Sequence, residues 1–203
     1  MRLLCLHGGG TNNRIFELQT AALRYELGSK YSFEFVEGSI LAPIAKDADS
    51  LAAADDEYFA YFHPLQPETL QTALQELHVY LVEEGPFDGV IAFSQGCGLA
   101  ASYMMQHHTD IKVPLWKFAI LFSGEPGEFV GDRGKGEDTD AIITIPTLHI
   151  WGARDTTNPT RNVLLDRQCC GRSKSSFVHQ GGHEVPSSSK DVTEIAHLIR
   201  RLC

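Results

Sequence analysis

Residues 88–98 read Asp-Gly-Val-Ile-Ala-Phe-Ser-Gln-Gly-Cys-Gly, which places one polar serine between two apolar segments. Val90–Phe93 is a short apolar run, typical of a buried strand, and the residues after Gly98 predict a packed helix. Packing does not explain a serine at this junction, whereas a nucleophile on a tight strand-to-helix turn does. Ala92 replaces the first glycine of the usual G-x-S-x-G pattern, and Gly96 supplies the second. The alternative is that Ser94 caps the following helix.

The composition is that of a globular protein and narrows the classes of partner. The chain has 203 residues, which predicts one domain over 1–203, with 43% hydrophobic and 21% charged residues. A net charge of −9 without a basic block argues against nucleic acid. No segment is long enough to cross a membrane, and the apolar run Leu3–Leu6 is too short for a signal peptide. Five cysteines, two of them adjacent, favour a reducing, cytoplasmic location, and no spacing suggests a metal site.

Strands and helices alternate along the whole chain. The apolar runs predict strands at 2–6, 33–36, 90–93, 117–122, 147–151 and 176–179. Helices are expected at 14–27, 67–84, after Ser94, at 158–167 and at 188–202. This alternation predicts an α/β fold with a mostly parallel sheet covered by helices on both faces, and ligands bind beyond the carboxyl ends of such strands.

Two segments interrupt this alternation. Residues 38–66 are rich in alanine, acidic residues and then aromatic residues, and they form either a lid or part of the core. Residues 125–141 are glycine-rich and charged, which favours a solvated loop over a phosphate-binding loop.

Complementary groups follow four of the predicted strands. Ser94 follows the central strand, Asp155 a later one and His183 the last, in the chain order that this sheet topology uses for a catalytic triad. A serine hydroxyl needs a base to take its proton, and a carboxylate fixes the tautomer of that base. We therefore expect Ser94 as nucleophile, His183 as base and Asp155 as orienting acid, a mechanism that needs no cofactor or metal.

Each member of the triad has a competitor. His179 competes with His183, but it is expected to be the last residue of a strand rather than a loop residue. Glu125 competes with Asp155 because it also follows a strand, and Asp155 can alternatively be a turn residue. Cys97 is a second possible nucleophile, although its helical position favours packing against the sheet.

An oxyanion site and a substrate surface are also expected. The backbone N–H of Gln95 lies at a helix start, and Gly9, or else Gly10, in the His7-Gly-Gly-Gly10 turn offers a second donor. Tyr58, Phe59 and Phe62 form an aromatic cluster that can line an apolar acyl channel.

Several motifs together resemble the small eukaryotic serine hydrolases of the FSH type, nearly end to end. They are Leu-His-Gly-Gly-Gly-Thr-Asn, Ala-Phe-Ser-Gln-Gly, Gly-Ala-Arg-Asp and Gly-Gly-His-Glu-Val-Pro. The resemblance implies an α/β-hydrolase fold with Ser94, Asp155 and His183 as the triad. Members of this family act as esterases, and some in fungal biosynthetic clusters are thioesterases that free a polyketide from its synthase.

Three functions remain open from the sequence. The first is hydrolysis of a thioester-bound acyl or polyketide chain on the acyl-carrier domain of a synthase. The second is hydrolysis of free carboxylic esters. The third is a non-catalytic member of the fold that only binds a ligand, against which the intact set of Ser94, Asp155 and His183 argues.

Overall fold

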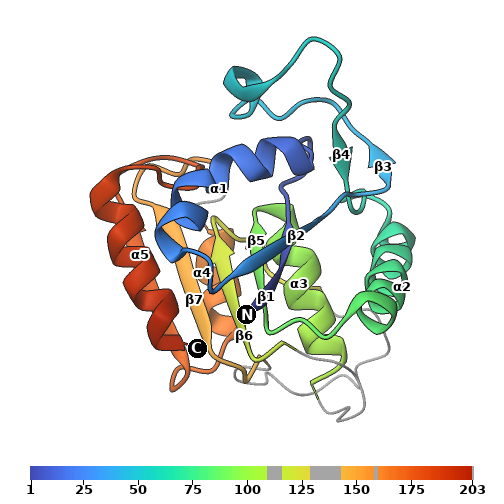
Figure 1. The fold of residues 1–203 in the computed structure, drawn as a ribbon. Coiled ribbons are helices and arrows are strands. Elements are labelled where there is room, and N and C mark those ends of the chain that lie inside the picture. Colours follow the sequence, from blue (N-terminus) through green and yellow to red (C-terminus); the bar gives the residue numbers. More distant parts are fainter. Residues whose placement is uncertain (109–115, 129–142, 158–159, 203) are drawn as a thin grey trace.

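A six-stranded parallel sheet forms the centre of the protein (Figure 1). The computed structural model describes residues 1–108, 116–128, 143–157 and 160–202. The strand order is β2-β1-β5-β6-β7-β8, and every neighbouring pair is parallel. The strands are β1 (Arg2–Leu6), β2 (Ser32–Val36), β5 (Gly89–Phe93), β6 (Phe118–Phe122), β7 (Thr147–Gly152) and β8 (Lys174–His179). Strand β2 is added on one side of β1, and β5 and the later strands are added on the other side. The carboxyl ends of β1 and β5 therefore border the point where such sheets bind ligands.

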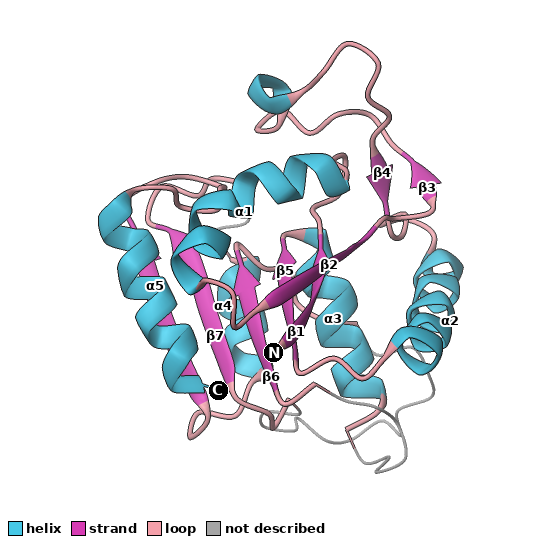
Figure 2. Ribbon diagram, in the orientation of Figure 1, coloured by secondary structure: helices cyan, strands magenta, loops and turns pink. Residues whose placement is uncertain are grey.

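Helices cover both faces of the sheet, as Figure 2 shows. On one face α1 (Asn13–Leu27) packs against α5 (Ser189–Leu202). On the other face α2 (Pro67–Glu84) packs against α3 (Gln95–Gln106), and α4 (Arg161–Gln168) contributes Leu165 to the same core. The predicted parallel sheet with helices on both sides is confirmed, and most predicted element ends lie within two residues of the observed ones.

Strand β5 shows why its sequence is apolar without interruption. Val90 and Ala92 point into the core beside α2 and α3, whereas Ile91 and Phe93 point into the core beside α1 and α5. All four side chains are buried. A strand covered on both faces has no solvent side, so the alternation of polar and apolar residues disappears.

The segment 38–66 stands beyond the carboxyl ends of the strands (Figure 1). It contains β3 (Ile40–Leu41) paired antiparallel with β4 (Phe59–Ala60), and a short 3-10 helix, η1 (Asp49–Leu51). Part of it belongs to the core, because Tyr61 and Phe62 are buried there, while most residues between Asp49 and Glu57 are exposed. Strands of two residues carry no periodic pattern, which is why the sequence did not indicate them.

Two sequence predictions fall partly outside the described residues. Most of the loop predicted at 125–141 lies there, and so do the first two residues of the helix predicted at 158–167. In the part of the chain that the structure describes, none of the helices combines the length and the apolar character that crossing a bilayer requires.

Candidate active site

Ser94 occupies a sharp turn between β5 and α3. Its backbone adopts φ 51° and ψ −114°, a conformation that L-residues rarely take and that is typical of functional sites. The turn brings α3 close to β1: a Cβ at Gly96 would lie 2.5 Å from the carbonyl oxygen of Leu6. Although Ser94 stands at the N-cap position, its side chain makes no capping hydrogen bond. The hydroxyl is therefore available for another partner.

That partner is His183, from the loop after β8. The distance from His183 Nε2 to Ser94 Oγ is 3.0 Å, and the distance from His183 Nδ1 to Asp155 Oδ2 is 2.9 Å. The Asp155 carboxylate is buried, and its other oxygen accepts the backbone N–H of Thr157 at 3.0 Å. The ring of His183 also packs on Phe93, with 5.0 Å between the ring centres. Three residues far apart in the chain thus form one hydrogen-bonded line.

The competing residues have other partners. His179 is buried, and its Nδ1 accepts the backbone N–H of Gly181. Glu125 forms an ion pair with Arg161 at 2.8 Å. The Cys97 thiol is fully buried below the turn, and burial raises the pKa of this thiol well above its ordinary value. Its reactive thiolate form is therefore disfavoured.

The loops that carry Asp155 and His183 are joined directly to one another. The backbone N–H of Arg154 donates to the Gly181 carbonyl, and the Arg154 guanidinium donates to the Gln180 carbonyl. A Cβ at Gly152 would lie 2.2 Å from the carbonyl oxygen of Gly182. Only glycine allows this close approach, which holds the carboxylate beside the imidazole.

Gly9 and Gln95 line the same cavity as Ser94. Within the described residues, neither backbone N–H has a recorded hydrogen-bond acceptor. The N–H of Gly10, by contrast, donates to the Phe59 carbonyl at 2.8 Å. Of the two glycines that the sequence offered as donors, Gly9 is the one with an unoccupied amide.

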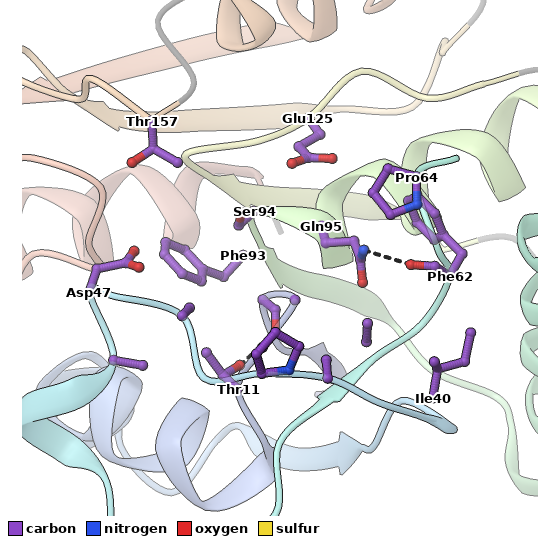
Figure 3. A pocket seen from close by; sticks show the side chains of 18 of the residues that line it. Thr11, Ile40, Asp47, Phe62, Pro64, Phe93, Ser94, Gln95, Glu125 and Thr157 are labelled. Atoms are coloured by element: carbon purple, nitrogen blue, oxygen red, sulfur yellow. Dashed lines mark hydrogen bonds between the residues drawn. The ribbon is translucent and has the colours of Figure 1, made fainter. Parts of the chain in front are cut away.

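The side chain of Gln95 joins this region to the segment 38–66. Its Oε1 accepts the backbone N–H of Tyr61 at 2.9 Å. Its Nε2 donates to the carbonyl of Phe62, also at 2.9 Å (Figure 3). A Cβ at Gly9 would lie 3.2 Å from the Gln95 amide carbon, so the glycine turn packs directly on this side chain. One buried amide therefore links the turn after β1, the start of α3 and the segment above them.

Replacing Gln95 with methionine, of similar volume, is expected to lower the free energy of unfolding by about 2–4 kcal/mol, because two buried backbone groups lose their partners. Urea unfolding measures this change. Gln19→Met is the matched control, since the buried Oε1 of Gln19 has no hydrogen-bond partner among the described residues. Equal destabilisation by the two substitutions would contradict the role given to Gln95.

A buried histidine supports the same turn from below. Gly38 N–H donates to His7 Nε2 at 3.0 Å, and the backbone N–H of His7 donates to the Tyr61 hydroxyl at 2.9 Å. His7 Nδ1 lies 2.8 Å from the Gly8 carbonyl oxygen, so the proton of the neutral ring is on Nδ1. Burial lowers the pKa of His7 to about 4, and burial of His149 on β7 lowers the pKa of that residue to about 4 as well.

These two histidines predict a loss of stability in mild acid. Between pH 6.5 and 4 these histidines bind protons in the unfolded chain but stay neutral in the folded chain. The free energy of unfolding is therefore unaffected by them above pH 6.5 and decreases as the pH falls below that value. Each histidine contributes a slope of about 1.4 kcal/mol per pH unit within that window. Urea unfolding at pH 5.0–6.5 should show a shallower slope for His149→Gln than for the wild type. Identical slopes would contradict a neutral, buried His149.

Ser94 opens into a cavity of about 420 Å³ between the sheet edge and the segment 38–66 (Figure 3). This volume lies in the range of small-molecule sites. Of the three residues in the predicted aromatic cluster, Phe62 lines the cavity, whereas Tyr58 and Phe59 are not among its lining residues. The backbone of Phe59 is instead paired with Thr11 and Leu41, which fixes β4 against the glycine turn. Sequence proximity to Phe62 therefore did not identify the residues on the cavity side.

Several lining residues escaped the sequence analysis. They include Gln19, Ile40, Pro43, Asp47, His63, Pro64 and Thr157. Asp47 begins an acidic, alanine-rich stretch in which nothing distinguishes it from its neighbours. Of these residues, only Thr157 could have been inferred from the sequence, because it lies two residues after the predicted triad member Asp155.

Comparisons with known proteins concern the family and the fold of the whole chain. A family model described as "Serine hydrolase (FSH1)" matches residues 1–195. "Esterase FPY3" of Fusarium mangiferae is 37% identical, covering 92% of this chain and 88% of its own. "Probable esterase tazC" of Aspergillus terreus is 30% identical, with 99% and 91% covered. The solved carboxylesterase of Bacillus cereus has a TM-score of 0.65 at 18% identity, covering 99% of this chain and 88% of that one, and shares the α/β-hydrolase fold.

Proposed function

The chain belongs to the serine hydrolase (FSH1) family and hydrolyses ester bonds, and we propose that it does so through Ser94, His183 and Asp155. The observation that supports this assignment is the continuous pair of contacts, 3.0 Å from Ser94 Oγ to His183 Nε2 and 2.9 Å from His183 Nδ1 to Asp155 Oδ2. The contacts lie at the mouth of a cavity, where a substrate carbonyl can reach the hydroxyl.

In the proposed mechanism Ser94 Oγ attacks the carbonyl carbon while His183 Nε2 takes the hydroxyl proton. The amides of Gly9 and Gln95 donate to the oxygen that becomes negatively charged. When the tetrahedral intermediate collapses, the bond to the leaving group breaks and His183 returns the proton to that group. A water molecule, activated by His183, then cleaves the acyl ester of Ser94. Asp155 keeps the imidazole in the tautomer that accepts the first proton.

We further propose that the substrate is an acyl thioester, with release of a polyketide or similar chain from an acyl-carrier domain as the biological reaction. The resemblance of the motifs to FSH-type enzymes supports this class, and a cavity with many apolar lining residues suits an acyl chain. The second candidate is hydrolysis of free carboxylic esters, which the names of the esterase relatives favour.

One comparison of rates separates these two substrates. The protein is assayed with a thioester and an oxygen ester that carry the same acyl chain. The ratio of their kcat/KM values is compared with the ratio of their rates of uncatalysed hydrolysis. A thioesterase is expected to favour the thioester beyond its intrinsic reactivity. Intact-mass analysis of the mixture should also show an acyl adduct at Ser94. Absence of both turnover and adduct with every substrate would contradict the proposal.

A further inference from the structure

One carboxylate from the segment 38–66 lies beside the atom of His183 that faces Ser94. Asp47 Oδ2 is 3.9 Å from His183 Nε2, which in turn is 3.0 Å from Ser94 Oγ. Because both distances are measured to the same nitrogen, the Asp47 carboxylate also lies near the serine hydroxyl. Figure 3 shows Asp47 on the same side of the cavity as Phe93, with its oxygens directed inward. This residue comes from outside the sheet and is not needed to orient the imidazole, which Asp155 already holds.

In the described part of the chain, neither a lysine nor an arginine pairs with the Asp47 carboxylate. Glu125, the other acidic residue that lines the cavity, is paired with Arg161 at 2.8 Å. No lysine or arginine lines the cavity within the described residues, and in that same part of the chain Asp47 forms no ion pair with either type. The side of the cavity beside His183 therefore holds a carboxylate that is not neutralised by an ion pair with lysine or arginine among these residues.

The Asp47 carboxylate lies where the leaving group departs during the proposed reaction. His183 Nε2 gives its proton to the leaving group, so the departing atom comes within hydrogen-bond reach of Nε2. Asp47 lies within 4 Å of the same nitrogen. A charge on the leaving group a few atoms from the scissile bond is therefore brought close to the Asp47 carboxylate, where Coulomb interactions are only partly screened.

We propose that Asp47 selects the leaving group by charge, favouring groups that are cationic or neutral near the scissile bond and disfavouring those with a carboxylate there. This inference rests on the proposed function, since it uses His183 as the proton donor. A leaving thiol carried on a neutral amide chain satisfies the rule, because any phosphate lies far along the chain.

Three thioesters with one butyryl group test this inference. Their leaving thiols are thiocholine, which is cationic, N-acetylcysteamine, which is neutral, and 3-mercaptopropionate, which is anionic. The measurement is kcat/KM from released thiol for wild type, Asp47→Asn and Asp49→Asn. Asp49 is exposed in the same segment and does not line the cavity, so its variant matches the change in net charge.

The preference is the ratio of kcat/KM for the thiocholine ester to kcat/KM for the 3-mercaptopropionate ester. Relative to the wild type, this ratio is expected to fall about tenfold in Asp47→Asn and to change less than about twofold in Asp49→Asn. Intrinsic differences between the thioesters and any inactive fraction of protein cancel in this ratio. Turnover with an unchanged ratio in Asp47→Asn, or an equal change in both variants, would overturn the inference alone. Failure of the wild type to release any thiol would overturn the proposed function together with it.

Discussion

Replacing Ser94 with alanine is expected to lower kcat by about 10⁴-fold or more. The physical reason is that, among the described residues, no hydroxyl or thiol other than Ser94 Oγ forms a hydrogen bond with His183 and could take over as nucleophile. The fold should persist, because the Ser94 side chain makes no capping bond and contacts only His183 among the recorded hydrogen bonds of the described residues. Steady-state hydrolysis measures the loss, and intact-mass analysis should show that the covalent adduct disappears.

Cys97→Ala is the control for the same experiment. The Cys97 thiol is fully buried and lies 3.4 Å from the Phe122 carbonyl oxygen, in the core rather than at the cavity. Its loss should leave acyl-adduct formation intact. Wild-type turnover by Ser94→Ala, or an adduct that moves to Cys97, would refute the assignment of the nucleophile.

Replacing Asp155 with asparagine is expected to lower kcat by about 10³- to 10⁴-fold. An amide N–H in place of Oδ2 would donate to His183 Nδ1 and move the ring proton to Nε2. In that tautomer the nitrogen that faces Ser94 cannot accept the hydroxyl proton. The measurement is kcat for a matched pair of esters, with thermal unfolding to show that the variant is folded.

Glu125→Gln separates the two acids that follow strands of the sheet. Glu125 contacts Arg161, so this variant should lose less than tenfold in kcat. A large loss in Glu125→Gln together with a small loss in Asp155→Asn would reverse the two assignments. The experiment thus resolves a choice between residues that both occupy the end of a predicted strand.

The sheet and its helices could be predicted because their sequences have strong, simple patterns. The 18 residues of α2 carry a leucine stripe between Pro67 and Gly85, and both predicted ends match. Strands β5 and β6 are short apolar runs, and each is followed directly by a serine, Ser94 or Ser123. Since parallel strands bring their carboxyl ends to one edge, the meeting of Ser94, Asp155 and His183 could be anticipated from chain order alone.

The cavity wall could not be predicted in the same way. The residues of 38–66 take their places through individual hydrogen bonds, such as those of Gln95 to Tyr61 and Phe62, and these follow no period. Tyr58 and Phe59 are aromatic like Phe62, yet only Phe62 lines the cavity. Asp47 reaches His183 from more than a hundred residues away in the chain, through a loop without regular structure.

The glycine at the end of β7 also bears on how such an enzyme changes its substrate. Because Gly152 leaves no room for a methyl group, the loops that carry Asp155 and His183 pack directly against each other, and a shift of one is expected to displace the other. Laboratory evolution toward a new acyl group should therefore accumulate few accepted mutations in these loops. It should collect them instead at cavity-lining positions of the segment 38–66, such as Ile40, Pro43 and His63, where side chains can vary without moving Asp155 or His183.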